Sequence, residues 1–140
     1  MACGLSRTIG GSVFNSERPE HFMMEVWNPL GIVGVITAFN FPCAVFGWNA
    51  AIAFICGDLV TWKGAPTTSL VTIASAKIIA EVFAKNNINP NVLTVVQGGA
   101  DIGQKMTEDK RIPLISFTGS TKIGKIIKQK VDERFGNTLL

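Results

Sequence analysis

GIVGVITA, residues 31–38, is the stretch of the sequence that decides the fold. It is almost continuously apolar and rich in β-branched side chains, as expected of a strand that is buried on both faces. Three further runs of the same kind follow along the chain: DLVTWK at 58–63, VLTVVQ at 92–97 and IPLISF at 112–117. Strands buried on both faces are typical of parallel sheets that helices cover above and below.

The segments between these strands have the pattern of helices. We expect helices at about 44–56, 69–86, 99–109 and 120–134. The alternation predicts an α/β fold, a partial Rossmann-like parallel sheet with crossover helices. Residues 137–140 have the composition of another strand at its opening, so the sheet is expected to be truncated before its next strand. Residues 1–30 do not join the alternation and are expected to form an arm or edge segment.

The charge and the cysteines exclude several classes of protein. A net charge of +3 is too small to indicate a nucleic-acid partner. Three widely spaced cysteines and one histidine provide neither a disulfide framework nor a metal site. We therefore expect an intracellular protein, cytoplasmic or mitochondrial, that holds no metal.

The apolar run at residues 43–60 raises the alternative of a small membrane protein. A membrane span needs about 20 predominantly apolar residues. Gly47, Asn49, Gly57 and Asp58 interrupt this run. A helix that ends at Gly57 and is followed by a strand explains the same residues, so we favour a protein without a membrane partner.

Ligands of such sheets bind beyond the carboxyl ends of the strands, where free helix N–H groups point. The fourth strand runs into Thr118, Gly119 and Ser120 and then directly into a helix. These backbone amides and hydroxyls could hold an anion, although Ser120 could equally be an ordinary N-cap. The usual G-x-G-x-x-G fingerprint of dinucleotide-binding proteins is absent.

Three further residues each allow a functional and a structural interpretation. Asn40, after the first strand, could donate to a developing oxyanion or could be a turn residue. Lys63, at the end of the second strand, could reach a ribose or phosphate or could be a solvated strand end. Trp48 could face a substrate or could belong to the core with Phe46 and Phe54.

Four motifs together resemble the aldehyde dehydrogenase superfamily in order and approximate spacing. They are WNPLG at 27–31, ITAFNFP at 36–42, WKGAP at 62–66 and SFTGST at 116–121. Three longer segments are similar to the antiquitin type, aldehyde dehydrogenase family 7, the semialdehyde dehydrogenases of lysine catabolism: WKGAPTTSL at 62–70, GGADIG at 98–103 and ERFG at 133–136. The resemblance covers essentially the whole chain and implies a fragment from the N-terminal half, with residues 31–140 as a partial dinucleotide-binding domain.

The resemblance also implies roles for individual residues. Asn40 matches an asparagine that helps a backbone N–H hold the oxyanion of a thiohemiacetal, a catalytic role. Trp48 matches an aromatic side chain of the tunnel that binds the aldehyde substrate. The residues that the resemblance assigns to the cofactor, NAD, are Thr37, Lys63, Gly64, Pro66, Gly99, Gly119, Ser120 and Ile123.

The sequence departs from the family pattern in two respects. Many NAD-preferring relatives carry an acidic residue three positions after the lysine, where this chain has Pro66, so the preference between NAD and NADP stays open. The family's general base and catalytic cysteine follow beyond position 140, so we expect this segment alone to be inactive. Cys43 and Cys56 are expected to be buried structural cysteines rather than substitutes for that nucleophile.

The sequence as a whole therefore predicts a segment of an NAD-dependent dehydrogenase that oxidises an aldehyde, such as a semialdehyde, to a carboxylic acid. The resemblance implies an aldehyde substrate and a homo-oligomeric full-length form. The alternative is a non-catalytic module that binds nucleotide or pairs with other subunits.

Overall fold

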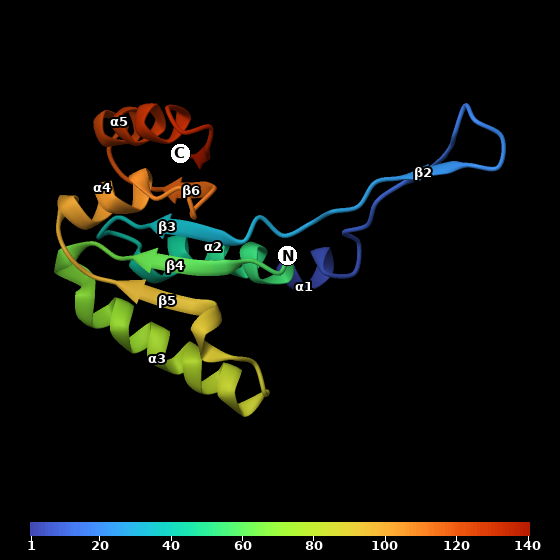
Figure 1. Cartoon of the computed structure of the whole chain (residues 1–140). Helices are drawn as coiled ribbons and strands as arrows, with labels where there is room; N and C mark the ends of the chain where they lie inside the picture. Colours follow the sequence, from blue (N-terminus) through green and yellow to red (C-terminus); the bar gives the residue numbers. More distant parts are fainter.

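The main sheet of the structure, a computed structural model that describes residues 1–140, has five parallel strands in the order β5-β4-β3-β6-β7 (Figure 1). The four predicted strands are confirmed within two residues at each end. The opening strand expected at 137–140 pairs with β6 as β7. The bounds are β3 Ile32–Ile36, β4 Leu59–Lys63, β5 Leu93–Val96, β6 Leu114–Phe117 and β7 Asn137–Leu139.

The four predicted helices are also confirmed within two residues. They are α2 Pro42–Ile55, α3 Ser69–Lys85, α4 Ala100–Glu108 and α5 Thr121–Asp132, with short 3-10 turns η1 Pro66–Thr68 and η2 Pro90–Val92. Gly57, which follows the end of α2, has φ +84°, a conformation that glycine adopts without steric cost. It allows the chain to turn from α2 into β4, as the sequence predicted.

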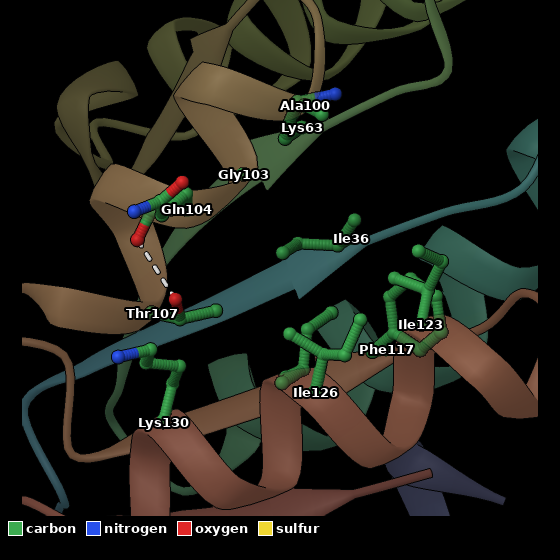
Figure 2. Close-up of a pocket in the computed structure, with 11 residues that line it drawn as sticks. Ile36, Lys63, Ala100, Gly103, Gln104, Thr107, Phe117, Ile123, Ile126 and Lys130 are labelled. Atoms are coloured by element: carbon green, nitrogen blue, oxygen red, sulfur yellow. Dashed lines mark hydrogen bonds between the residues drawn. The ribbon is translucent and has the colours of Figure 1, made fainter.

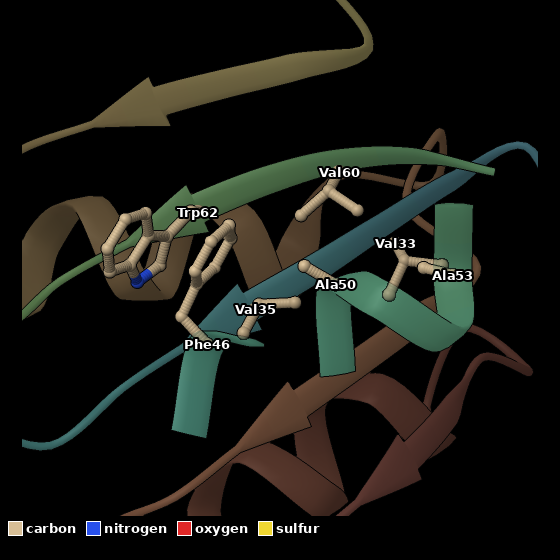
Figure 3. Packing of buried hydrophobic residues seen from close by; sticks show 7 residues of the cluster. All are labelled: Val33, Val35, Phe46, Ala50, Ala53, Val60 and Trp62. Carbon is tan, nitrogen blue, oxygen red and sulfur yellow. The ribbon is translucent and has the colours of Figure 1, made fainter. Parts of the chain in front are cut away.

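Two apolar cores lie on opposite faces of the sheet because side chains alternate along each strand. On one face Val33 and Val35 of β3 pack with Trp62 and with Phe46 of α2 (Figure 3). The rings of Phe46 and Trp62 are stacked, with centroids 3.8 Å apart. On the other face Ile36 and Ile115 pack against residues of α4 and α5, namely Met106, Ile127 and Val131.

The order of the strands creates a switch point between β3 and β6. After β3 the chain continues outward through β4 and β5, and then crosses back to place β6 on the other side of β3. At such a point the connections from neighbouring strands leave in opposite directions and open a crevice beyond the carboxyl ends. Ile36 of β3 and Phe117 of β6 are partners in register at this end, so the segments that follow them begin side by side.

The first thirty residues form a separate feature beside the sheet. A short helix, α1 Ala2–Leu5, is followed by a two-stranded antiparallel hairpin of β1 Val13–Asn15 and β2 Phe22–Met24. The hairpin projects away from the sheet (Figure 1), and all six of its strand residues are exposed. This agrees with the expected arm, whereas the division into a segment 1–30 and a domain 31–140 stays a prediction.

The expected burial of Cys43 and Cys56 is wrong, because both are exposed. The residues of α2 that face the sheet lie in the middle of the helix, between Val45 and Ala53. Cys43 belongs to the first turn and Cys56 is the C-cap, so both lie at the ends of the helix, beyond its buried face. The Cys43 Sγ lies 3.2 Å from the Ser75 hydroxyl of α3.

The run 43–60, weighed above as a membrane span, is not one helix but a helix, a turn and the start of β4. The continuous helical stretch Pro66–Lys85, 20 residues with a mean hydropathy of 1.4, is long and apolar enough to cross a membrane by length and composition alone. Core helices of soluble proteins meet the same criterion but are mostly buried, whereas only 6% of the apolar window of this helix is buried.

Candidate functional site

A cavity of about 340 Å³ opens at the carboxyl end of the sheet, between α4 and α5 (Figure 2). Its floor is formed by the last residues of three strands, Ile36, Lys63 and Phe117. Its volume lies within the range of small-molecule pockets, about 300 to 1,000 Å³. The cavity therefore lies where a doubly wound sheet is expected to bind its ligand.

The walls of the cavity come from facing sides of the two helices. Ala100, Gly103 and Thr107 of α4 recur at helical spacing and, with Gln104, form one wall. The isoleucines of α5 form the apolar wall opposite, and the members of that side are Ile123, Ile126, Ile127 and Lys130. A small-residue wall facing an aliphatic wall is suited to a flat, apolar ring.

Lys63 is the buried one of two lysines that line this cavity, and the other, Lys130, is exposed and pairs with Glu133. Only 6% of Lys63 is exposed, and its Nζ donates one hydrogen bond, to the Gly64 carbonyl at 3.4 Å. Its aliphatic stem passes along α4, where a Cβ on Gly103 would lie 3.8 Å from Cδ and Cε. Burial lowers the pKa of Lys63 from its ordinary value, while the nearby Asp101 carboxylate acts in the opposite direction. The amine makes no ion pair within the chain and is available to a ligand.

Glycines at the strand exits permit backbone approaches that other residues would block. Gly98 has φ +148°, and a Cβ there would overlap Ile102. A Cβ on Gly119 would overlap the ring of Phe117 in the same way, and one on Gly64 would overlap Thr72. These three turns depend on glycine, and two of them border the cavity through Phe117 and the start of α4.

The exit of β6 forms a helix cap, as the structural interpretation of Ser120 predicted. The Ser120 hydroxyl accepts a hydrogen bond from the Ile123 amide at 3.4 Å and caps α5. A second hollow of about 350 Å³ lies beside it and includes Gly119, Ser120 and Lys125 in its lining. Small hydroxyl and glycine residues with one lysine are a suitable setting for a phosphate, and the anion-binding role of Gly119 and Ser120 stays a prediction.

Asn40 follows β3 and Gly119 follows β6, and the last residues of these two strands, Ile36 and Phe117, are partners in register. Asn40 is exposed, and its side-chain amide makes no hydrogen bond within the chain. Thr37 has a different environment, since it is 3% exposed and its hydroxyl accepts a hydrogen bond from the Trp62 indole at 3.0 Å. Thr37 therefore orients Trp62, and its assigned cofactor contact stays a prediction.

Three other residues assigned from the sequence lie outside the cavity. Trp48 is on α2, which packs on the opposite face of the sheet, and is 61% exposed, so its interpretation as core packing is wrong. Pro66 begins the 3-10 turn after β4 and is exposed. Gly99 is the N-cap of α4, next to the wall residue Ala100. The structure thus brings together Lys63 and Ile123 in one cavity, with Gly99 at its edge.

The sequence did not indicate most of the cavity walls. Gly103, Gln104 and Thr107 of α4 and Ile126 and Lys130 of α5 were not assigned to the site. Their spacing of three and four residues was visible, but it does not distinguish a helix face that lines a cavity from one that packs on the core. These walls could be predicted only if it were known that α4, before β6, and α5, after β6, face each other on the same side of the sheet.

A larger hollow of about 800 Å³ lies at the base of the hairpin, between residues 8–11, 25–30 and 55–58. It is on the amino-terminal side of β3 and β4, away from the strand exits. No group of three or more histidine, cysteine or acidic residues could hold a metal ion in this structure. The smaller cavity is the candidate site because it lies at the carboxyl ends of the strands, where such sheets bind ligands.

Comparison with known proteins gives three kinds of match. The family model described as the aldehyde dehydrogenase family matches residues 1–140. Among curated proteins, the chain is 64% identical over 137 residues to aldehyde dehydrogenase family 7 member A1 of Pisum sativum, covering 98% of this chain and 27% of that protein. It is 57% identical over 139 residues to alpha-aminoadipic semialdehyde dehydrogenase of Bos taurus, covering 99% of this chain and 26% of that protein. The chain thus spans about a quarter of the length of these relatives.

Solved structures of similar architecture include two with different bound cofactors. Glyceraldehyde-3-phosphate dehydrogenase of Methanocaldococcus jannaschii, complexed with NADP, matches with a TM-score of 0.88 and 29% identity, over 98% of this chain and 29% of that one. Betaine aldehyde dehydrogenase of Staphylococcus aureus, in complex with NAD, matches with a TM-score of 0.86 and 27% identity, over 98% of this chain and 27% of that one.

Proposed function

The chain belongs to the aldehyde dehydrogenase family, and from this membership we propose that it supplies the dinucleotide-binding part of an enzyme that oxidises an aldehyde to a carboxylic acid with NAD. The observation that carries the proposal is the cavity between α4 and α5, with the buried amine of Lys63 on its floor. A cavity of that shape at the carboxyl end of a doubly wound sheet fits an adenosine group.

The residues present fit the dinucleotide in three respects. The isoleucine wall of α5 and the small residues of α4 suit the flat adenine ring. Lys63 supplies a cation and hydrogen-bond donors to the adjoining ribose and phosphate. The glycine turn at Gly119 and the capped start of α5 suit the pyrophosphate, since helix N-termini favour anions. Bound dinucleotide supplies the acceptor for the hydride that leaves the substrate.

Asn40 is the residue of this chain that we assign to the reaction itself. Attack on an aldehyde carbonyl turns its oxygen into an anion, and a preorganised N–H donor stabilises that charge more than it stabilises the neutral carbonyl. Asn40 lies at the switch point with its amide free to donate. The proposal places the nucleophile and the general base of the complete enzyme outside these residues, so this segment alone is inactive.

For the substrate we propose a semialdehyde. The support is the similarity to a protein described as alpha-aminoadipic semialdehyde dehydrogenase, which is 57% identical to this chain. Trp48 is proposed to line the substrate path, consistent with its 61% exposure on α2. The test compares kcat/KM for aliphatic aldehydes with and without a distal carboxylate. It shows whether the enzyme prefers an aldehyde that carries a second charged group.

We propose an intracellular enzyme, cytoplasmic or mitochondrial, and the three free cysteines suit a reducing compartment. We further propose a homo-oligomer without a nucleic-acid or membrane partner, to which the exposed apolar residues of the projecting hairpin contribute. Cell fractionation and light scattering of the purified protein test these two points.

The experiment that tests the function combines binding with turnover. NAD is titrated by calorimetry into the intact protein that carries this chain, and NADH formation is followed by absorbance with an added semialdehyde. We expect saturable binding and aldehyde-dependent NADH. Binding without turnover would favour the alternative of a non-catalytic nucleotide-binding module, and the absence of both would overturn the proposal.

A further inference from the structure

The preference between NAD and NADP is not decided by the fold. The two cofactors differ by a phosphate on the 2′-oxygen of the adenosine ribose, and solved structures that match this chain are described with either one. The preference therefore has to come from side chains beside the adenosine ribose. In the cavity proposed to bind adenosine, we place the ribose at the end where Lys63 and Ala100 lie (Figure 2).

The carboxylate that acts on Lys63 belongs to Asp101, in the first turn of α4. β4 and β5 are adjacent, and Lys63 is paired in register with Val96, so the chain that leaves β5 passes beside Lys63. One Asp101 carboxylate oxygen lies 3.1 Å from the point that a Cβ on Gly99 would occupy, so the side chain folds back over the start of the helix. Asp101 is exposed and makes no ion pair or hydrogen bond within the chain.

Without this carboxylate the same place would suit a phosphate well. It would combine the free N–H groups and the positive end of the α4 dipole with the ammonium group of Lys63, the arrangement that anions favour. Asp101 does not line the cavity itself, but it follows the lining residue Ala100 and puts negative charge at that end of α4. It can accept hydrogen bonds from two neighbouring ribose hydroxyls, whereas it repels a phosphate at the 2′ position.

We propose that Asp101 determines the cofactor preference of this protein, accepting hydrogen bonds from the ribose diol of NAD and excluding the 2′-phosphate of NADP. The proposal rests on the proposed function. It also explains how an NAD site can be built although Pro66, the position expected to carry the acidic residue, has no charge. Burial lowers the pKa of Lys63, and the negative charge of Asp101 acts in the opposite direction, which agrees with the two groups lying close to each other.

The test compares both cofactors in the intact protein and in three variants. Asp101→Asn keeps the shape and removes the charge, Asp101→Glu restores the charge, and Glu81→Gln removes an exposed carboxylate of α3, away from the cavity. Two quantities are measured: kcat/KM for NAD and NADP with one aldehyde, and the dissociation constants of 5′-AMP and adenosine 2′,5′-bisphosphate by calorimetry. The second measurement does not depend on turnover.

We expect the unmodified protein to prefer NAD and 5′-AMP, and Asp101→Asn to shift both ratios toward the 2′-phosphorylated ligand by about tenfold or more. Asp101→Glu and Glu81→Gln should keep the original ratios. If the protein binds NAD but Asp101→Asn leaves both ratios unchanged, the inference is overturned and the proposed function stands. A protein that binds neither dinucleotide overturns both.

Discussion

Lys63 combines a buried stem with an amine that has no ion-pair partner, and burial lowers its pKa below the ordinary value. Only the protonated amine attracts the ribose and phosphate, so affinity for NAD is present at neutral pH and declines as the pH rises toward that lowered pKa. We expect the decline to begin at a lower pH than it would for an exposed lysine. The measurement is the NAD dissociation constant between about pH 7 and 10.

The matched variant for this prediction is Lys63→Arg, because arginine stays protonated throughout that range. Its affinity for NAD should be independent of pH there, even if it is weaker overall. A Lys63→Arg protein with the same alkaline decline as the original would show that Lys63 is not the titrating group.

Asn40 is the residue that the proposed reaction depends on most within this chain. Asn40→Ala should lower kcat by about 10²–10³, the usual effect of removing one oxyanion donor, and should leave the dissociation constant of NAD unchanged. Asn91→Ala, an exposed asparagine next to β5, serves as the control and should change neither. A loss of less than about threefold in kcat for Asn40→Ala would contradict the role.

At the scale of single residues, candidate site residues could be named from the sequence, but the burial of several side chains could not be predicted. Lys63 and Asn40 could be named because parallel strands end at one edge of a sheet, where ligands of such folds bind. The burial of Thr37 could not be predicted, because it depends on a contact with Trp62, which is distant in sequence. The exposure of Cys43 could not be predicted either, because it depends on where along α2 the face that packs on the sheet begins.

The pair of helices α4 and α5 is the element on which the site depends. Gly103 of α4 faces the cavity, and a Cβ there would meet only the stem of Lys63, at ordinary contact distance. Gly103→Ala should therefore be tolerated, and it should stabilise the helix by up to about 1 kcal/mol. Gly103→Leu should fill the cavity and abolish NAD binding.

Calorimetric titration of NAD into both variants checks this prediction, with circular dichroism to confirm that each remains folded. Binding by Gly103→Leu that equals binding by Gly103→Ala would mean that the nucleotide does not enter between the helices. The pair is informative because the two changes are at one position and differ only in side-chain volume.

The existence and type of every main element could be predicted at this scale, because β-branched runs and helical runs alternate so regularly. The facing of α4 and α5 could not. It follows from the return of the chain across β3 to β6, and strand order is a property of the whole sheet rather than of any one segment.

For the whole molecule, Trp62 is the largest fully buried side chain, and it links β4 to α2 and to the end of β3. Trp62→Ala should destabilise the fold by about 3–5 kcal/mol, because it leaves a cavity beside Phe46. Trp62→Phe should cost less, since it keeps most of the apolar volume and loses mainly the hydrogen bond to Thr37. Denaturant unfolding measures both, and equal effects of the two variants would contradict this account of the core.

The most direct test of the central claim, that the cavity between α4 and α5 binds the adenosine part of NAD, is photolabelling of the intact protein with an 8-azidoadenine analogue of NAD. The labelled peptides are identified by mass spectrometry, with excess NAD as competitor. We predict that label protected by NAD falls within residues 100–108 and 121–132. Protected label confined to the hollow at the base of the hairpin, around residues 8–11 and 25–30, would contradict the claim.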